Sequence, residues 1–417
     1  MFNGVGAPNG PGVQQFARWF RYPAGFSKVA LNACFEAASL SSGSLVVDPF
    51  AGVATTGVQS IELGFRFIGI EVHPLIAEVA GLKFMRPTSA DQLVEQARML
   101  ERQNKQGSIT SENSLITRSF DAATLAQLVG LRQGIQSLQG NPWQLHLKWC
   151  LLGALRDCAS AKVGWPYQRP GESRVPRIAD PCRAFVRRAQ WMASDLSMAS
   201  DAPVASVHHG DARAASVWRM ALGKTAADLV ITSPPYLNNF DYADATRLEL
   251  YFWGVAHSWE QMTRFVRSDM VVATTQQSRR ATADTSAVSL ATLCPTTFPA
   301  LQELREKLRQ ERAKRSRGKE YDQVLPAYFI DLARVLINVR DHTVPHAIVA
   351  LVLGDSAPYG VYVDTPGLLA QVAEELGFER VNVRSLRQRG LRWQTNGTRH
   401  SIDLTEQLVV LRSPGVR

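Results

Sequence analysis

The sequence is short of the cysteines that cross-link small secreted proteins and of the apolar runs that cross membranes. Five of its 417 residues are cysteine, and they show neither Cys-x-x-Cys spacing nor clustering with histidine. We therefore expect no disulfide framework and no metal site. No apolar run approaches the ~20 residues of a membrane helix. The Gly- and Pro-rich residues 1–12 also lack the charged and apolar regions of a signal peptide, so we expect a cytoplasmic protein without membrane contact.

Acidic residues are also in deficit, 37 against 46 Lys and Arg, which gives a formal net charge of +9 and a pI near 9.5. This balance suits a polyanionic partner, although a solvated basic surface gives the same composition. The chain is longer than one simple domain. Its patterns divide it into segments 1–85, 86–205, 206–254, 255–325 and 326–417.

A loop rich in proline follows a short apolar strand, expected at residues 227–231. The loop reads Thr232-Ser233-Pro234-Pro235-Tyr236. Proline ends the strand and keeps the preceding residue extended, so backbone carbonyls of the loop stay free to accept hydrogen bonds. Together with a hydroxyl and an aromatic ring, they suit a flat ligand that carries an exocyclic amine. The alternative is an ordinary Pro-Pro turn with a packing tyrosine.

A strand–loop–helix–strand pattern covers residues 45–71. The loop has small residues that let the backbone approach a ligand, and the second strand ends in Glu71, where an acid can bind ribose hydroxyls. The distance in sequence from Asp48 to Glu71 is close to the ~20 residues expected between such a loop and its ribose acid. A generic Rossmann-like unit for another nucleotide is the alternative.

Together, the segments Asp48-Pro49-Phe50-Ala51-Gly52 and Thr232–Tyr236 resemble the cofactor loop and the catalytic loop of the DNA amino-methyltransferases. These enzymes methylate cytosine N4 or adenine N6 with S-adenosylmethionine (SAM). The resemblance implies an α/β fold with a doubly wound, Rossmann-like sheet of seven strands and one antiparallel edge hairpin. The patterns of this chain predict two insertions in that core: residues 86–205, mostly helical, and residues 255–325, basic and partly mobile.

By the same resemblance, SAM is the cofactor. The residues expected to bind it are Phe26, Lys28, Asp48, Phe50, Ala51, Gly52, Thr55, Thr56, Glu71 and Asp211. One position departs from the family, which usually has a second glycine where this chain has Ala54. The added methyl is tolerable with ordinary backbone angles and costly if φ is positive.

The implied catalytic residues are Ser233, Pro234, Pro235 and Tyr236. An exocyclic amine is a poor nucleophile because its lone pair is conjugated with the ring. Acceptors for its two hydrogens, here the Ser233 hydroxyl and the Pro234 carbonyl, favour the pyramidal form, and Tyr236 would stack on the base. Within the resembled family, a serine at the first position favours cytosine N4 over adenine N6. A base in a duplex would have to be flipped out to reach this site.

Substrate contacts are expected from two places. Asn238, Asn239 and Tyr242 follow the catalytic loop and could line the base pocket, although Tyr242 could equally pack at the start of a helix over residues 245–253. A helix expected at residues 301–317 carries Arg312, Lys314 and Arg315, which could contact DNA. A solvated helix face is the usual role of such a run.

Two further basic segments could also contact nucleic acid. In the first insertion, helical periodicity at residues 90–103, 125–138 and 143–156 is followed by Arg183, Arg187 and Arg188, which fit phosphate contact or base stacking. The other is the run from Arg384 to Arg392. Which insertion reads the target sequence stays open.

We therefore expect a SAM-dependent DNA methyltransferase with DNA as its partner. A restriction or phage-defence protein could accompany it, and the oligomeric state stays open. The alternatives are an RNA base methyltransferase and a non-catalytic SAM- or nucleic-acid-binding protein. Calorimetric SAM binding together with modified-nucleoside analysis would distinguish them.

Overall fold

The computed structural model describes residues 16–22, 28–85, 89–164, 168–197, 204–238, 240–277, 280–389 and 402–415. Phe26 and Asn239, both expected to be site residues, lie outside these ranges, and of Lys28 only the backbone is described. The chain forms two compact units. The helical unit comprises Met1–Gly25, Pro74–Ala202 and Tyr242–Arg267, and the sheet unit comprises Phe26–His73, Pro203–Asp241 and Ser268–Arg417.

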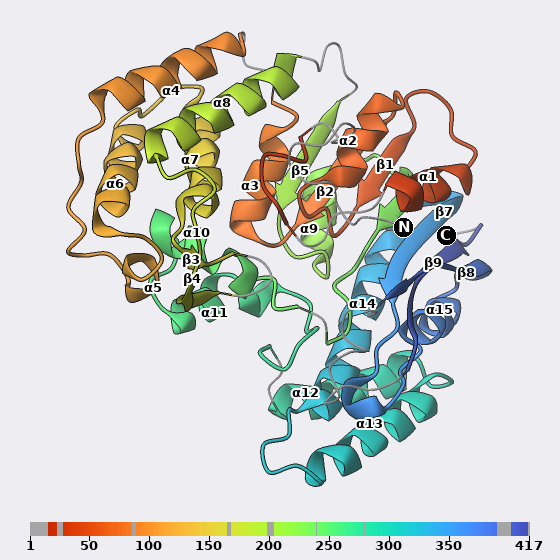
Figure 1. Cartoon of the computed structure of the whole chain (residues 1–417). Coiled ribbons are helices and arrows are strands. Elements are labelled where there is room, and N and C mark those ends of the chain that lie inside the picture. Colours follow the sequence, from red (N-terminus) through yellow and green to blue (C-terminus); the bar gives the residue numbers. More distant parts are fainter. Residues whose placement is uncertain are drawn as a thin grey trace. The chain divides into compact units, whose positions relative to one another are not determined.

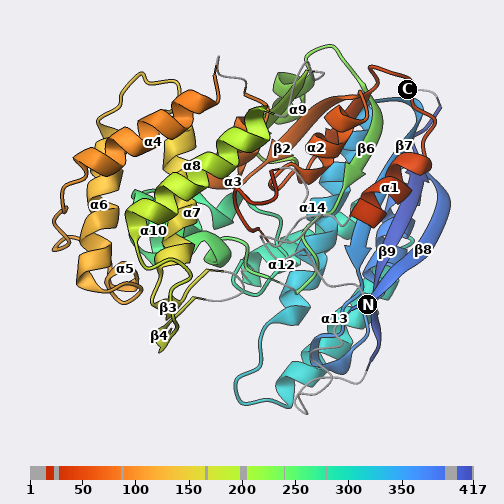
Figure 2. The same cartoon turned by 45° about the horizontal axis from the view of Figure 1, so that its top comes forward.

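The sheet unit contains a single seven-stranded sheet in the order β5-β2-β1-β6-β7-β9-β8 (Figures 1 and 2). Its strands are β1 Leu45–Asp48, β2 Arg66–Glu71, β5 Ala205–His209, β6 Ala227–Thr232, β7 Thr343–Gly354, β8 Glu379–Arg389 and β9 Leu404–Arg412. The first five in the order are parallel, and β9 runs antiparallel to both of its neighbours. The expected seven-stranded, Rossmann-like sheet with an antiparallel edge hairpin is confirmed.

The strand order reverses between β1 and β6. From β1 the chain moves outward to β2 and β5, and it then returns to place β6 on the other side of β1. In open α/β sheets, the crevice at the carboxyl ends of the strands beside such a switch point is the usual ligand site. The two loops singled out from the sequence leave the sheet there, after β1 and after β6.

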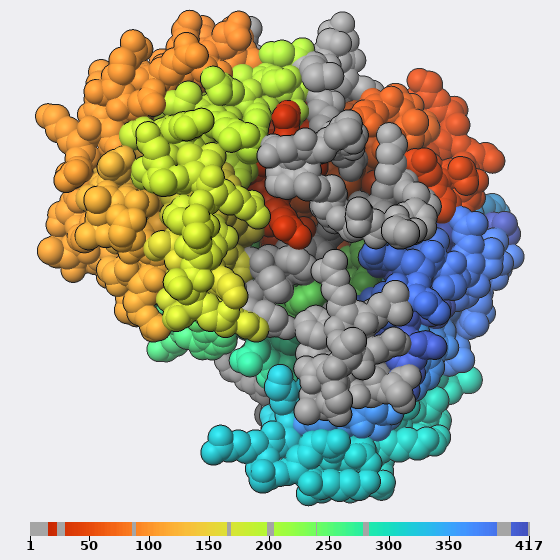
Figure 3. Space-filling view, in the orientation of Figure 1, coloured from red at the N-terminus to blue at the C-terminus, as the bar shows by residue number. Residues whose placement is uncertain are grey.

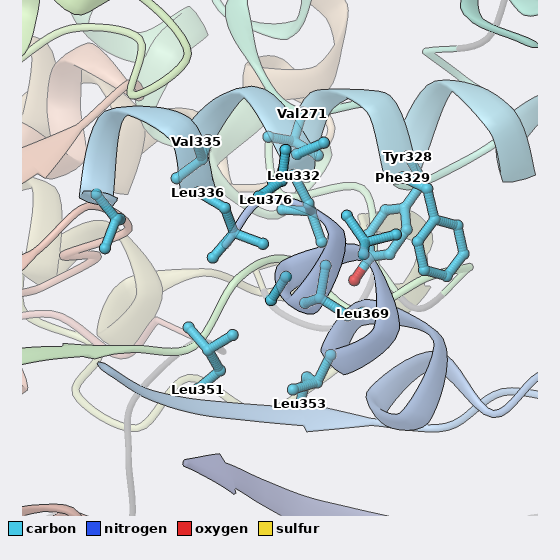
Figure 4. Close-up of a cluster of buried hydrophobic side chains, with 14 of the residues drawn as sticks. Val271, Tyr328, Phe329, Leu332, Val335, Leu336, Leu351, Leu353, Leu369 and Leu376 are labelled. Carbon is cyan, nitrogen blue, oxygen red and sulfur yellow. The ribbon is translucent and has the colours of Figure 1, made fainter. Parts of the chain in front are cut away.

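Helix α14, Tyr321–Asp341, carries much of the core of the sheet unit. Its side chains Tyr328 and Leu332 point toward Leu369 of α15, Thr365–Glu375, and toward Leu353 on β7 (Figure 4). These residues are buried, so each apolar side chain among them contributes roughly 1.5–3 kcal/mol. The other helices of the unit are α1 Lys28–Glu36, α2 Thr55–Glu62, α9 Ala215–Leu222, α12 Arg280–Leu293, α13 Phe298–Ala313 and the short η2 Arg267–Asp269 and η3 Pro358–Gly360.

The second insertion differs from its expected form. Both α12 and α13 pack against α14, and Leu290, Leu301 and Leu308 belong to the same buried cluster as the α14 side chains. These leucines pack both helices on the core, and the partial mobility of the insertion stays a prediction. Helix α13 also begins earlier and ends earlier than the expected 301–317.

The helical unit is built around α7, Gln144–Cys158, which is almost wholly buried. Helix α8, Pro181–Ser197, packs on α7 and also on α4, Asp91–Gln103, and α6, Ala122–Gln136. The remaining elements are α3 Pro74–Leu82, α5 Ser114–Thr117, β3 Ala161–Lys162, β4 Arg169–Ser173, η1 Asp244–Thr246, α10 Arg247–Trp253 and α11 Trp259–Phe265. The unit therefore extends beyond the expected boundaries 86–205, since residues 74–85 and 242–267 share its contacts.

Across the described part of the chain, none of the helices has the length and apolarity that a bilayer crossing requires.

Candidate active site

The candidate site lies at the carboxyl ends of four adjacent strands. In the order of the sheet, Asp211 follows β5, Glu71 ends β2, Asp48 ends β1 and Thr232 ends β6. The β1 loop, residues 49–54, and the β6 loop, residues 233–237, extend from this edge. The parallel sheet thus brings together residues that are far apart in sequence.

Asp48 connects the β6 strand with the β1 loop and its helix. One carboxylate oxygen accepts hydrogen bonds from the Thr232 hydroxyl at 2.6 Å and from the Phe50 amide at 3.0 Å, and the other accepts from the Thr56 hydroxyl at 2.7 Å. Burial raises the pKa of Asp48 to about 6, although these hydrogen bonds favour the ionised form. Thr232 was not expected in this role, and its signal was its place at the end of an apolar strand.

Glu71 holds the backbone of the β1 loop. Its carboxylate accepts from the Gly52 amide and from the His73 amide, each at 2.8 Å. Burial raises the pKa of Glu71 to about 7. The β1 loop lies close against β2, because a Cβ on Gly69 would stand 2.7 Å from the Cβ of Ala51. A side chain at position 69 would therefore push the loop away from the sheet.

Ala54 adopts the left-handed conformation, with φ 57° and ψ 44°, immediately before α2. This conformation usually favours glycine, because a Cβ crowds the following carbonyl. The departure from the family pattern therefore falls at a position where the methyl group is costly. Ala54 is fully buried.

Asp211 is part of an ion-pair chain that the sequence did not reveal. Arg213 binds the Asp211 carboxylate at 2.8 Å and reaches Asp331 of α14 at 2.7 Å. Its guanidinium also donates to the carbonyl of Asp269. These ion pairs fix the loop after β5 to α14 while leaving the Asp211 side chain partly exposed.

The β6 loop presents Ser233 and Tyr236 together. The Ser233 hydroxyl donates to the Tyr236 hydroxyl at 3.4 Å, and the latter donates to Glu406 of β9 at 2.9 Å. Arg387 of β8 binds Glu406 through two nitrogens, at 2.7 and 2.9 Å. Burial, and next the charge of Glu406, holds the pKa of Tyr236 well above its ordinary range. Sequence reasoning missed Glu406, and its signal was an acid inside the apolar strand Leu404–Arg412.

The basic C-terminal run makes contacts within the sheet unit. The Arg389 guanidinium lies 4.7 Å from the centre of the Tyr236 ring and donates to the Asp355 carbonyl at 3.0 Å. Its position requires Gly354, because a Cβ there would stand 1.7 Å from an Arg389 nitrogen. Arg387 and Arg389 are thus turned toward the β6 loop, and residues 390–392 lie outside the described ranges.

Asn238, which follows the loop, has an unusual environment. Its φ is 56°, and its backbone amide donates to the Ala273 carbonyl at 2.7 Å. Both polar atoms of its side chain are buried and have no hydrogen-bond partner among the described residues. A buried amide left unpaired costs about 1–3 kcal/mol, so the conformation suits a group that meets a polar ligand. Tyr242 belongs to the helical unit, where its ring centre lies 6.0 Å from that of Tyr22.

The three cations expected to contact DNA lie at the end of α13 and just beyond it, and all three have acidic partners. Arg312 pairs with Asp322 at 3.1 Å, while Lys314 and Arg315 both pair with Glu311. Arg315 also lies over the Tyr359 ring at 4.1 Å. Three acids of α13, Glu303, Glu306 and Glu311, pair with cations of the same run.

The residues around the β1 loop fit the SAM expected from the resemblance. Acceptors for ribose hydroxyls are present at Glu71, and the Asp211 carboxylate is partly exposed at the neighbouring strand end. Gly69 keeps the loop backbone close to β2, and Gly52 has a positive φ of 52°. Small residues, acceptors and close backbone approach are what a nucleoside cofactor needs.

Comparison with known proteins agrees with this reading. A family model described as DNA methylase, for N6- and N4-specific enzymes, matches residues 12–81. The Type II methyltransferase M.BsoBI of Geobacillus stearothermophilus is 23% identical over 451 residues, covering 96% of this chain and 86% of that protein. The Type II methyltransferase M.AvaI of Nostoc sp. is 22% identical and covers 95% and 86%. Among solved structures, the rRNA methyltransferase aviRa of Streptomyces viridochromogenes covers 95% and 90% at 10% identity, with a TM-score of 0.33 that is too low to bear on function.

Proposed function

We propose that this SAM-dependent DNA methyltransferase, which is similar to the N6- and N4-specific DNA methylases and to Type II methyltransferases, methylates the N4 amine of a flipped-out cytosine. The observation that supports this choice is the hydroxyl of Ser233 at the first position of the β6 loop, bonded to Tyr236. The family resemblance associates a serine there with cytosine N4.

The chemistry follows from the geometry of the β6 loop. Ser233 donates its own proton toward Tyr236, so its lone pairs remain available to accept from an amine. The Pro234 carbonyl supplies the second acceptor, and Pro235 keeps that part of the loop out of a helix. SAM, when bound, supplies a sulfonium methyl group that needs no metal or thiol. The protein then contributes positioning and electrostatics.

Under this proposal the cofactor is held by the β1 side of the site. Glu71 accepts from the ribose hydroxyls, Asp211 from the adenine amine, and the backbone of Gly52 lies against the cofactor. Asp48 keeps the β1 loop and the β6 strand in register through Thr56 and Thr232. The remaining contacts are assigned to Phe26, Lys28, Phe50, Ala51 and Thr55.

The base is read by residues after the β6 loop. The unpaired amide of Asn238 offers a donor and an acceptor, which suit the ring nitrogen and carbonyl beside the cytosine amine. Asn239 is assigned to the same pocket, and Tyr242 of the helical unit remains a proposed substrate contact. Arg312, Lys314 and Arg315 would contact the DNA backbone by exchanging their acidic partners for phosphate, and neutralising them should lower DNA affinity and flatten its salt dependence. An unchanged salt slope would remove them from the proposal.

The relatives are Type II methyltransferases, so the proposal extends to a companion restriction endonuclease that recognises the same site. DNA from cells that express the protein would then resist that endonuclease.

Nucleoside mass spectrometry on DNA and RNA from a methylation-deficient host tests the proposal. We expect N4-methylcytosine in the DNA of cells expressing the protein and none with a Ser233→Ala/Tyr236→Ala variant. N6-methyladenine instead would retain the enzyme class and overturn the target base. A modified base in RNA alone would establish an RNA methyltransferase. SAM binding by calorimetry without any modified base would indicate a non-catalytic protein.

A further inference from the structure

Methylation of an exocyclic amine leaves a proton to be removed. When the nitrogen lone pair forms the new N–C bond, the electrons of the broken C–S bond stay on sulfur, and the nitrogen becomes cationic. One of its hydrogens must then leave as a proton to restore conjugation with the ring. The argument below rests on the proposed function and concerns where this proton goes.

A chain of hydrogen bonds leads away from the proposed amine acceptor. Ser233 donates to Tyr236 at 3.4 Å, and Tyr236 donates to Glu406 at 2.9 Å. Both donors point in the same direction, away from the lone pairs with which Ser233 would meet the amine. The first link is long, as catalytic hydrogen bonds often are before substrate binds.

The end of the chain is a buried carboxylate. Glu406 is 6% exposed on β9, where it lies between Thr405 and Gln407. An isolated charge there would be expensive, and the paired nitrogens of Arg387 offset that cost. The carboxylate oxygen that accepts from Tyr236 also accepts from Arg387, so the β6 loop and strand β8 both fix its position.

From this geometry we propose that Glu406 is a positioning residue that also ends a proton relay from the substrate amine through Ser233 and Tyr236. The amine proton moves to the Ser233 oxygen as the Ser233 proton moves to the Tyr236 oxygen and the Tyr236 proton moves to Glu406. The products are a neutral methylated amine, unchanged serine and tyrosine, and a protonated Glu406 that later releases its proton to solvent.

The carboxylate also acts before the proton moves. Positive charge develops on the amine in the transition state, and a negative charge at the end of the chain polarises both hydroxyls toward it. Ser233 therefore becomes a stronger acceptor at the moment when the amine needs one. Tyr236 stays neutral throughout and passes a proton only as it receives another.

The test is a double-mutant cycle with Glu406→Gln and Tyr236→Phe. Glutamine keeps an acceptor for Tyr236 but loses the charge, and phenylalanine keeps the ring but breaks the chain. We expect each variant to slow single-turnover methylation of target DNA by about 10- to 100-fold, with SAM and DNA affinities unchanged. The double variant should be no slower than the slower single variant, because both substitutions interrupt one relay.

The matched control is Glu379→Gln on the same hairpin, which removes a carboxylate paired with Arg412 at 2.7 Å. It should methylate at the wild-type rate. The relay would be overturned if Glu406→Gln methylated at the wild-type rate. It would also be overturned if the rate losses of the two single variants multiplied in the double variant, or if the variants lost only SAM or DNA affinity. If Glu406→Gln failed to fold, Tyr236→Phe would still test the relay, because it leaves the Glu406–Arg387 pair intact. A wild-type protein that methylates no DNA would refute the proposed function itself, and the relay with it.

Discussion

At the scale of single residues, we expect Glu71 to make cofactor binding sensitive to pH. Burial raises its pKa to about 7, so the folded protein is partly protonated there near neutrality. Because the pKa of Glu71 is higher in the folded than in the unfolded protein, its protonation stabilises the SAM-free fold. This contribution is fully present below pH 4.5, the ordinary pKa, and is lost as the pH rises through about 7. Ribose hydroxyls need an acceptor, which the ionised carboxylate provides. Cofactor binding and protonation of Glu71 therefore compete.

We expect SAM to bind about tenfold more tightly at pH 8 than at pH 6, with a proton released on binding near pH 7. Calorimetry in buffers of different ionisation enthalpy measures both quantities. In Glu71→Gln, which cannot ionise, the affinity should be weaker and largely independent of pH in this range. Equal wild-type affinities at the two pH values would contradict the assignment.

Ala54 offers a second prediction at this scale. Glycine would relieve about 1–2 kcal/mol of left-handed strain, but it would lose about 0.8 kcal/mol of methyl burial and about 0.4–1 kcal/mol through the freer unfolded chain. These terms nearly cancel, so Ala54→Gly should change the free energy of unfolding by less than about 1 kcal/mol. Ala54→Val should lower the free energy of unfolding by about 3 kcal/mol. A β-branched side chain is strained in the left-handed conformation, and its extra methyl groups would enter a packed interior.

Denaturant unfolding measures these changes. The matched control is Ala333→Gly in the interior of α14, where the alanine is equally buried but has no left-handed strain to relieve. It should cost about 1–2 kcal/mol from helix propensity and lost burial. A similar loss for Ala54→Gly would show that its conformation carries no strain.

At the scale of elements, we expect α8 to contact DNA. Its residues lie on the face of the helical unit seen in Figure 3. A groove of about 540 Å³ is lined by Glu101, Arg183, Val186, Arg187, Gln190 and Trp191. The Arg187 guanidinium stands 4.9 Å from the Trp191 ring centre. Arg183 and Arg187 have no carboxylate partner within salt-bridge distance among the described residues, so they can meet phosphate.

We expect Arg183→Ala/Arg187→Ala to weaken DNA binding and to reduce the slope of log affinity against log salt by about two. Fluorescence anisotropy at several salt concentrations measures the slope. Arg219→Ala/Lys224→Ala removes the same charge from exposed positions at and after α9 and should leave the slope close to wild type. Equal effects of the two variants would mean that only net charge matters.

Elements differ in how far their sequence predicts them. The buried strands β1 and β6 read as apolar runs, because parallel strands are covered on both faces. Strand β8, Glu379–Arg389, does not stand out as an apolar run, since an exposed edge strand keeps charged residues. Asp48 and Glu71 were predictable because their loop and strand are local in sequence. Glu406 was not, because its partner Tyr236 is 170 residues away.

At the scale of the whole molecule, the two units have separate cores and different numbers of tryptophan residues. Helix α7 centres one core, and α14 with the sheet centres the other. Among the described residues, Trp218 is the single tryptophan of the sheet unit. The helical unit contains Trp19, Trp143, Trp149, Trp191, Trp253 and Trp259. Tryptophan fluorescence therefore follows mainly the helical unit, whereas circular dichroism follows both units.

The proposed SAM contacts belong to the sheet unit. Ligand that binds one folded unit stabilises that unit by about 2.7 kcal/mol at a hundred times its dissociation constant. We expect saturating SAM to raise the melting temperature of part of the circular dichroism transition while the fluorescence midpoint stays in place. The Glu71→Gln variant, with its weaker SAM binding, should show a smaller separation at the same SAM concentration. If SAM raised both midpoints equally, the two units would unfold as one cooperative body, because a ligand bound in one core would then be stabilising the other.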